Sequence, residues 1–195
     1  MTEGDRRRHV VPALLLSLSG LLAARSASAD DTIKHPGDHP KYAVEIEPHV
    51  LLGWNYIYPG DAWGIGGRFS IPVVQNGFVP SINNSVAVSF GVDALFYNAC
   101  WYHQDCSATY LDFPVTLQWN FFVAQHWSVF GEPGLMLYHG FFNDCPPGST
   151  CPGVPEATGI SPVIFLGGRY HLSDSTALTL RIGFPTFSFG FSFML

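Results

Sequence analysis

The chain has 195 residues, of which 15% are aromatic and only 12% are charged, and its net charge at pH 7 is −6. This length suits a single domain. The acidic balance, without a basic patch after residue 29, argues against nucleic acid as a partner.

The first 29 residues have the layout of a secretory signal peptide. Residues 6–8 are three arginines, residues 12–24 are apolar, and residues 27–29 read Ala-Ser-Ala, a small-x-small cleavage site. Cleavage there leaves 166 residues and changes the net charge from −6 to −8, because four arginines and two acidic residues are removed. We expect residues 30–40 to be a flexible N-terminal linker and residues 41–195 to fold.

The linker contains His35 and His39 among acidic residues. A metal-binding tail is one interpretation of this stretch. A solvated linker before the first strand is the expectation, because termini are commonly poorly ordered. We therefore expect no metal site and no cofactor.

After residue 40 the dominant pattern alternates apolar and polar side chains, which is typical of strands with two different faces. No apolar run of about 18 residues follows the signal peptide, so a chain that crosses a membrane here has to form a closed barrel. Each alternating segment is close to the ~10 residues that cross a bilayer at a tilt. The eight segments are 41–56, 64–74, 85–98, 110–121, 127–138, 159–172, 178–185 and 184–195.

Charged side chains are confined to the polar faces of these segments. The residues are Glu45, Glu47, Arg68, Asp93, Asp112, Glu132, Arg169 and Arg181. A soluble barrel carries its charges outside, but the only two lysines, Lys34 and Lys41, precede the first strand. Because a buried arginine needs carboxylate partners, we expect one charge network that fills the barrel interior. The apolar face, which includes Val86, is then expected to contact lipid.

The segments that connect the predicted strands contain two cysteine pairs and one unusually long turn. Cys100 and Cys106 form one local pair, and Cys145 and Cys151 form another, each with five residues between the partners. Four cysteines allow three connectivities, and local disulfides that brace exposed loops are the economical choice in an exported chain. Residues 75–84 are longer than the short turn expected at their position.

The chain ends in a strand that alternates large apolar residues with small ones. The large residues are Phe187, Phe189, Phe191, Phe193 and Leu195. With the other seven strands, this end resembles small Gram-negative outer-membrane barrels of the OmpA and OmpX type, over roughly residues 41–195. The resemblance implies an all-β fold, an eight-stranded antiparallel up-and-down transmembrane β-barrel. It also implies that the last strand is the signal read by the barrel assembly machinery, although Leu195 replaces the usual final Phe.

The favoured function is an integral outer-membrane protein with a structural or surface-interaction role and without catalysis. Its expected partners are outer-membrane lipid and lipopolysaccharide, and the barrel assembly machinery during biogenesis. We expect a monomer. A soluble exported β-barrel or sandwich, with its apolar face in a protein core, is the main alternative to a membrane location.

Two further functions remain open. Lipid A deacylases among small outer-membrane barrels carry a His-x-Ser motif, and His171-Leu172-Ser173 has that spacing. However, Asp174 stands where the family has Asn, no Glu follows, and the motif falls at a turn.

The other function is a conduit for hydrophobic small molecules through the barrel wall. Pro114, Pro133 and Pro162 fall inside predicted strands, where each removes a ladder hydrogen bond. They could open a lateral gap, but bulges at barrel corners are the favoured reading.

Overall fold

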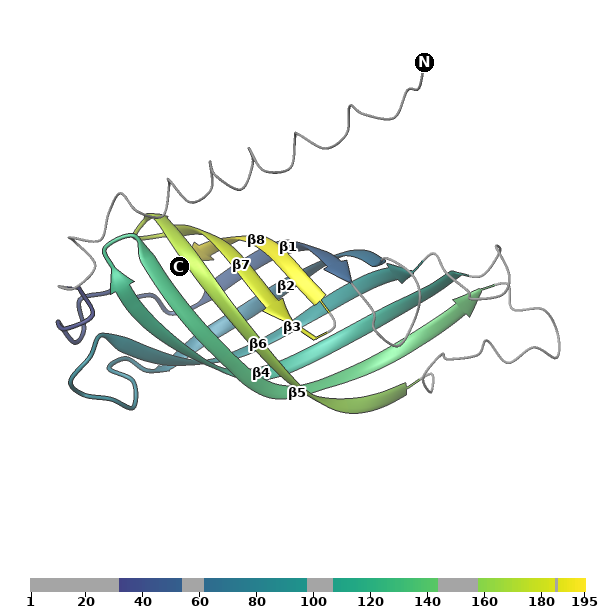
Figure 1. Cartoon of the computed structure of the whole chain (residues 1–195), viewed down its shortest axis with the longest axis horizontal. Coiled ribbons are helices and arrows are strands. Elements are labelled where there is room, and N and C mark those ends of the chain that lie inside the picture. The colour runs from purple at the N-terminus through teal and green to yellow at the C-terminus, as the bar shows by residue number, and fades with distance from the viewer. Residues whose placement is uncertain (1–31, 54–61, 98–106, 144–157, 185) are drawn as a thin grey trace, which may run out of the picture.

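The computed structural model describes residues 32–53, 62–97, 107–143, 158–184 and 186–195. These residues form a closed barrel in which each strand pairs antiparallel with the next and the last strand pairs with the first (Figure 1). The strands are β1 (Glu45–Gly53), β2 (Ala62–Val74), β3 (Asn84–Tyr97), β4 (Ser107–Ala124), β5 (Trp127–Asn143), β6 (Thr158–Ser173), β7 (Thr176–Gly183) and β8 (Thr186–Met194). The predicted all-β, eight-stranded up-and-down order is confirmed.

The barrel closes where β8 meets β1. Phe189 pairs with Val50 and Phe193 pairs with Ile46, and the backbone N–H of Leu195 donates to the carbonyl of Val44 at 2.9 Å. The first strand therefore begins beside the last residue of the chain, at what we call the terminus end. Gly53, Tyr97 and Asn143, the last residues of β1, β3 and β5, lie at the opposite end, which we call the loop end.

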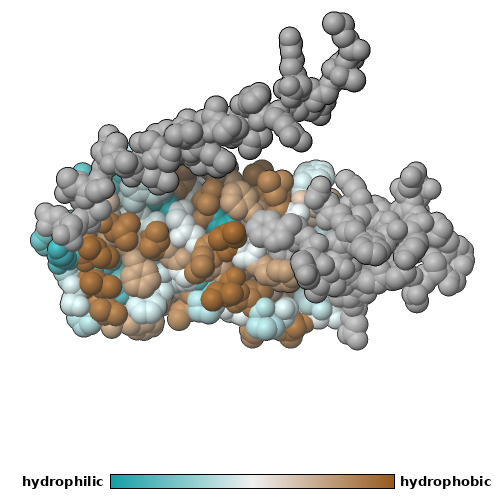
Figure 2. Space-filling view, in the orientation of Figure 1, coloured by the Kyte–Doolittle hydropathy of each residue, from teal (hydrophilic) through white to brown (hydrophobic). Residues whose placement is uncertain are grey.

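The alternation of side chains separates two environments. Arg169 and Arg181 are each 2% exposed, whereas Phe189 on the neighbouring β8 is 47% exposed. Hydrophobic side chains gather over the outer wall of the described strands (Figure 2). No helix among the described residues is long and apolar enough to cross a membrane.

Large interior side chains lie against glycines on adjacent strands. A Cβ atom added to Gly167 would overlap the ring of Phe130, and one added to Gly183 would overlap the ring of Phe165. Such pairing of large with small residues lets side chains fill an eight-stranded barrel. Gly167 and Gly183 are therefore positions at which an interior ring approaches the backbone closely.

The expectation that Pro114, Pro133 and Pro162 mark bulges is wrong, although another strand proline, Pro72, adjoins a register shift. Pro114 pairs with Met136 and Pro162 pairs with Leu135, and the ladder register does not shift at these positions or at Pro133. The register shifts instead between residues 72 and 74, 122 and 124, and 171 and 173. These irregularities adjoin the three connections at the terminus end, where strands bend into turns.

The expectation that Val86 lies on the exposed apolar face is also wrong. Its position on β3 points outward, yet its exposed fraction is 0%. Its ladder partners are Val74 and Trp119. The turn that begins after Val74 folds back along the outside of the barrel at this point, a feature that a strand pattern alone does not predict.

Candidate functional site

The interior of the barrel holds the charged residues, and Arg181 on β7 makes the largest set of contacts there. Its Nη1 and Nη2 donate to the two carboxylate oxygens of Glu47 at 2.6 and 3.1 Å, and its Nε donates to Glu132 at 3.0 Å. The partners come from β1 and β5, on different sides of the barrel. The planar guanidinium suits this geometry because it presents several donors in fixed directions.

Arg169 on β6 forms the second set of contacts. Its Nη2 lies 2.9 and 3.0 Å from the two oxygens of Glu45, and its Nη1 donates to Asn120 at 2.7 Å. Tyr42, just before β1, donates its hydroxyl to Glu45 at 3.4 Å. Burial, and then the charge of Glu45, hold the pKa of Tyr42 above its ordinary value, so this hydroxyl keeps its proton.

Phe130 lies close to both of these arginines. The centre of its ring is 4.4 Å from the Cζ atom of Arg169 and 5.2 Å from that of Arg181. The ring thus offers its electron-rich surface to both guanidinium groups. Reasoning from the sequence missed Phe130, although its position two residues before Glu132 already placed it on the inner face.

Arg68 and Asp93 form a third contact, towards the loop end. Nη1 and Nη2 of Arg68 each lie 2.9 Å from one oxygen of Asp93. His49 links this pair to the first set, because its Nε2 is 2.9 Å from Asp93 and its Nδ1 is 3.6 Å from Glu47. The alternation of residues 41–56 puts His49 on the same polar face as Glu45 and Glu47, although it is not one of the eight charged residues named above.

Asp112 differs from the other seven charged residues. It is buried and lies opposite Asp93 in the β3–β4 ladder, but it takes no part in the ion pairs described above. The structure therefore brings seven of the eight residues into direct contacts and leaves Asp112 beside them. Among the described residues, no group of three or more histidine, cysteine or acidic side chains could hold a metal ion.

The two members of the candidate catalytic pair contact other residues, and no hydrogen bond joins them among the described residues. The Nε2 of His171 lies 2.9 Å from the hydroxyl of Ser128, inside the barrel, and its Nδ1 has no hydrogen-bond partner among the described residues. Ser173 is exposed in the turn, where its hydroxyl contacts Ser175 and Thr176 at 3.3 and 2.8 Å. The motif therefore supplies turn contacts and not a serine activated by an oriented imidazole.

Four residues of the expected assembly signal lie on β8 and point to the outside, and the fifth, Leu195, directly follows that strand. Phe189, Phe193 and Leu195 are exposed, and the rings of Phe191 and Phe193 are 5.2 Å apart. Ser188 and Ser192 point inward and are buried. The cleavage site and the four cysteines lie outside the described residues, so the signal peptide and the disulfides stay predictions.

Residues before β1 contact the barrel at its terminus end. The Nδ1 of His39 lies 2.6 Å from the side-chain oxygen of Asn83, and its ring stacks on Phe122 with centres 4.4 Å apart. Asn83 also donates through Nδ2 to the carbonyl of Asp38 at 2.6 Å. His39, for which a metal-binding tail was considered, is thus held by an amide and an aromatic ring.

Comparisons with known proteins found neither a matching family model nor a matching curated protein. Among solved structures, the chain is similar to the attachment invasion locus protein Ail of Yersinia pestis, crystallised with the heparin analogue sucrose octasulfate. That likeness has 13% identity and a TM-score of 0.48, and covers 78% of this chain and 96% of the other.

Neisserial surface protein A gives 14% identity and a TM-score of 0.47, over 78% of this chain and 96% of the other. A de novo designed transmembrane β-barrel gives 15% identity and a TM-score of 0.44, over 84% of this chain and 99% of the other. These likenesses concern the course of the backbone, and the function proposed below rests on the wall and interior of this barrel.

Proposed function

We propose that this protein is an integral outer-membrane β-barrel with a structural or surface-interaction role and no catalytic activity. The observation that carries the proposal is the polarity of the barrel: apolar side chains are exposed outside, and charged side chains are buried inside. Burying an arginine costs free energy that only well-placed partners offset, whereas an exposed wall of Val, Ile, Leu and Phe is favourable in lipid. A soluble barrel has the reverse arrangement.

The filled interior supports a role other than that of a general pore. Arg169, Arg181, Glu45, Glu47 and Glu132 are each at most 2% exposed. Their contacts join strands from around the barrel, so that they occupy the space a channel would need. We propose that this charge-filled interior stiffens the barrel and that the protein acts through its loops.

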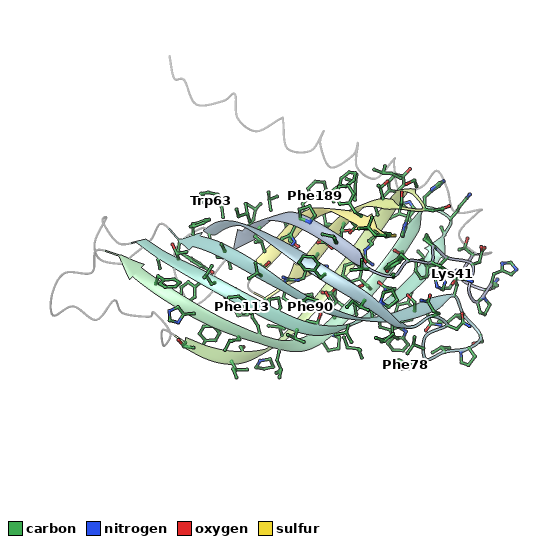
Figure 3. All side chains as sticks on the ribbon, turned by 180° about the vertical axis from the view of Figure 1, so that it is seen from behind. Lys41, Trp63, Phe78, Phe90, Phe113 and Phe189 are labelled. Atoms are coloured by element: carbon green, nitrogen blue, oxygen red, sulfur yellow. The ribbon has the colours of Figure 1, made fainter. Side chains whose placement is uncertain are left out.

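Aromatic side chains at both ends of the wall support the membrane location. Trp63 and Phe96 contact each other at the loop end, with ring centres 4.8 Å apart. Trp127 and Tyr170 do so at the terminus end, at 5.0 Å. Aromatic residues of this kind prefer the two interfaces of a membrane. Trp63 lies towards one end of the barrel and Lys41 lies at the other (Figure 3).

Several finer expectations belong to this proposal. After export, the alternating β8 would be the strand read by the assembly machinery, and the termini would face the periplasm. Disulfides between the local cysteine pairs would brace the loops, which would meet lipopolysaccharide or a surface partner. We propose that the barrel works as a monomer, because closure leaves no strand edge in the described barrel unpaired.

Cell fractionation combined with gel mobility tests the proposal. A closed membrane barrel remains folded in detergent until it is heated, so boiled and unboiled samples should migrate differently. We expect the protein in the outer-membrane fraction with such a shift. Recovery in a soluble fraction, with the same mobility before and after boiling, would show that the apolar wall is covered by protein and that the proposal is wrong.

A further inference from the structure

The connection between β2 and β3 is an ordered turn and not a simple link. The backbone N–H of Gly77 donates to the carbonyl of Val74 at 3.4 Å, and that of Ile82 donates to Val79 at 3.3 Å. Gly77 has a φ of +54°, which favours glycine. A Cβ atom at this position would also overlap the side-chain amide of Asn84. Both the backbone conformation and the lack of space for a Cβ atom therefore require glycine at position 77.

Asn84 fastens this turn to the barrel wall. Its position on β3 points outward, yet it is 0% exposed. Its Nδ2 donates to the carbonyls of Val79 and Ile82 at 2.7 and 2.8 Å, and its Oδ1 accepts from the indole Nε1 of Trp119 at 2.9 Å. An amide on the outward side of a membrane barrel is costly unless its polar atoms are paired, and here they are paired within the protein.

The consequence is that Phe78 lies on the outside of the barrel. Its ring meets Trp119 edge to face, with centres 5.6 Å apart, and the residue is 57% exposed. Val73, at the end of β2, is 55% exposed, so the apolar wall continues into the turn. The side chain of Phe78 projects from the ribbon near the end marked by Lys41 (Figure 3).

We propose that residues 75–84 are an interfacial anchor, which inserts Phe78 between the headgroups and acyl chains of the leaflet at the terminus end. This inference rests on the proposed membrane location and adds a specific lipid contact to it. Phe78 and Trp119 form an apolar surface that continues the wall, and the N–H of the indole is already satisfied by Asn84. The exposed Lys41 at the same end is of the right charge for lipid phosphates.

Photo-crosslinking from single positions tests this proposal. Benzoylphenylalanine would replace Phe78 in one variant, Phe189 on the wall in a second, and Gln75, an exposed polar residue of the same turn, in a third. Each folded protein would be placed in vesicles of phosphatidylethanolamine and phosphatidylglycerol and irradiated, and lipid adducts would be measured by mass spectrometry. The heat-dependent gel shift would show that each variant is folded.

We expect lipid adducts at positions 78 and 189, several-fold above those at position 75. If lipid adducts form at position 189 but are no more abundant at position 78 than at position 75, the anchor is overturned. The proposal of a membrane barrel would still stand. A lack of adducts at all three positions would overturn both proposals. In whole cell envelopes, adducts from position 78 to a protein instead of lipid would likewise overturn the lipid anchor.

Discussion

Arg181 and Glu47 are 134 positions apart in the chain and form a two-point ion pair inside the barrel, with N–O distances of 2.6 and 3.1 Å. Glu132 accepts a hydrogen bond from Nε of the same guanidinium at 3.0 Å. One buried cation is therefore shared by two carboxylates from two other strands. The shared cation on β7 therefore links β1, at the start of the barrel sequence, with β5.

Removing the charge of Arg181 alone should destabilise the barrel more than removing the charges of Arg181, Glu47 and Glu132 together. Arg181→Met leaves Glu47 and Glu132 buried without it, and we expect a loss of about 3–5 kcal/mol in the free energy of unfolding. The triple variant that also carries Glu47→Gln and Glu132→Gln should regain most of that loss. Urea unfolding in lipid vesicles measures both.

Ile182→Ala is the matched control for Arg181→Met, since the neighbouring residue on β7 points outward. It should change the stability far less. If Arg181→Met and Ile182→Ala destabilise the barrel equally, the interior ion pairs do not contribute as described.

Gly167 and Gly168 offer a direct test of the interior packing. Gly167→Ala places a methyl group where the ring of Phe130 lies, and we expect a cost of about 1–3 kcal/mol as the ring moves away from the two arginines. Gly168→Ala meets its nearest atom, the carbonyl oxygen of Ser128, at 3.7 Å and should be tolerated. Equal stability of the two variants in urea would contradict a tightly filled interior.

The contacts of Asn83 predict the behaviour of the segment before β1. Asn83→Ala removes hydrogen bonds to His39 and Asp38, so trypsin should cut after Lys34 and Lys41 faster than in the parent protein. The chain has no other lysines, and the three arginines after residue 29, Arg68, Arg169 and Arg181, are buried in the barrel, so the fragments released from the folded protein are simple to assign by mass. Gln75→Ala, on the exposed surface of the nearby turn, should leave the cleavage rate unchanged. The same rate in both variants would mean that Asn83 does not hold the segment.

His171 binds Ser128 while Ser173 binds residues of its own turn, which predicts that the protein has no effect on lipid A. Cells that make the protein, cells that make the Ser173→Ala variant and cells that lack it should yield lipid A of the same masses. Loss of an acyl chain only in cells with the parent protein would overturn the non-catalytic role and return the serine to the candidate nucleophiles.

The fold follows from the sequence to a large extent, because period-two alternation determines which side chains share a face. Arg68, Arg169 and Arg181 were assigned to the inner face on that basis, and each is buried. Their partners depend on how neighbouring strands are staggered, which alternation does not encode. For this reason the contact of Arg181 with both Glu47 and Glu132 is visible only in the folded barrel.

Other features depend on contacts that strand patterns do not describe. Val86 is buried beside a turn that packs against its ladder partner Trp119, and this turn is held by side-chain amide contacts of Asn84. Phe130 resembles any strand phenylalanine in the sequence, but Gly167 on the next strand gives its ring room beside two arginines. In each case a tertiary contact overrides what the local pattern predicts.

The central claim is that the wall of this barrel faces lipid and its charged interior faces neither lipid nor bulk water. Paramagnetic broadening of NMR signals in lipid nanodiscs tests it most directly, with a spin-labelled fatty acid as the lipid probe and a gadolinium chelate as the water probe. The account predicts that signals of Val50, Phe90 and Phe189 are broadened by the lipid probe alone, while the guanidinium signals of Arg169 and Arg181 are broadened by neither. Broadening of the wall signals by the gadolinium chelate would place the wall in water and contradict the account.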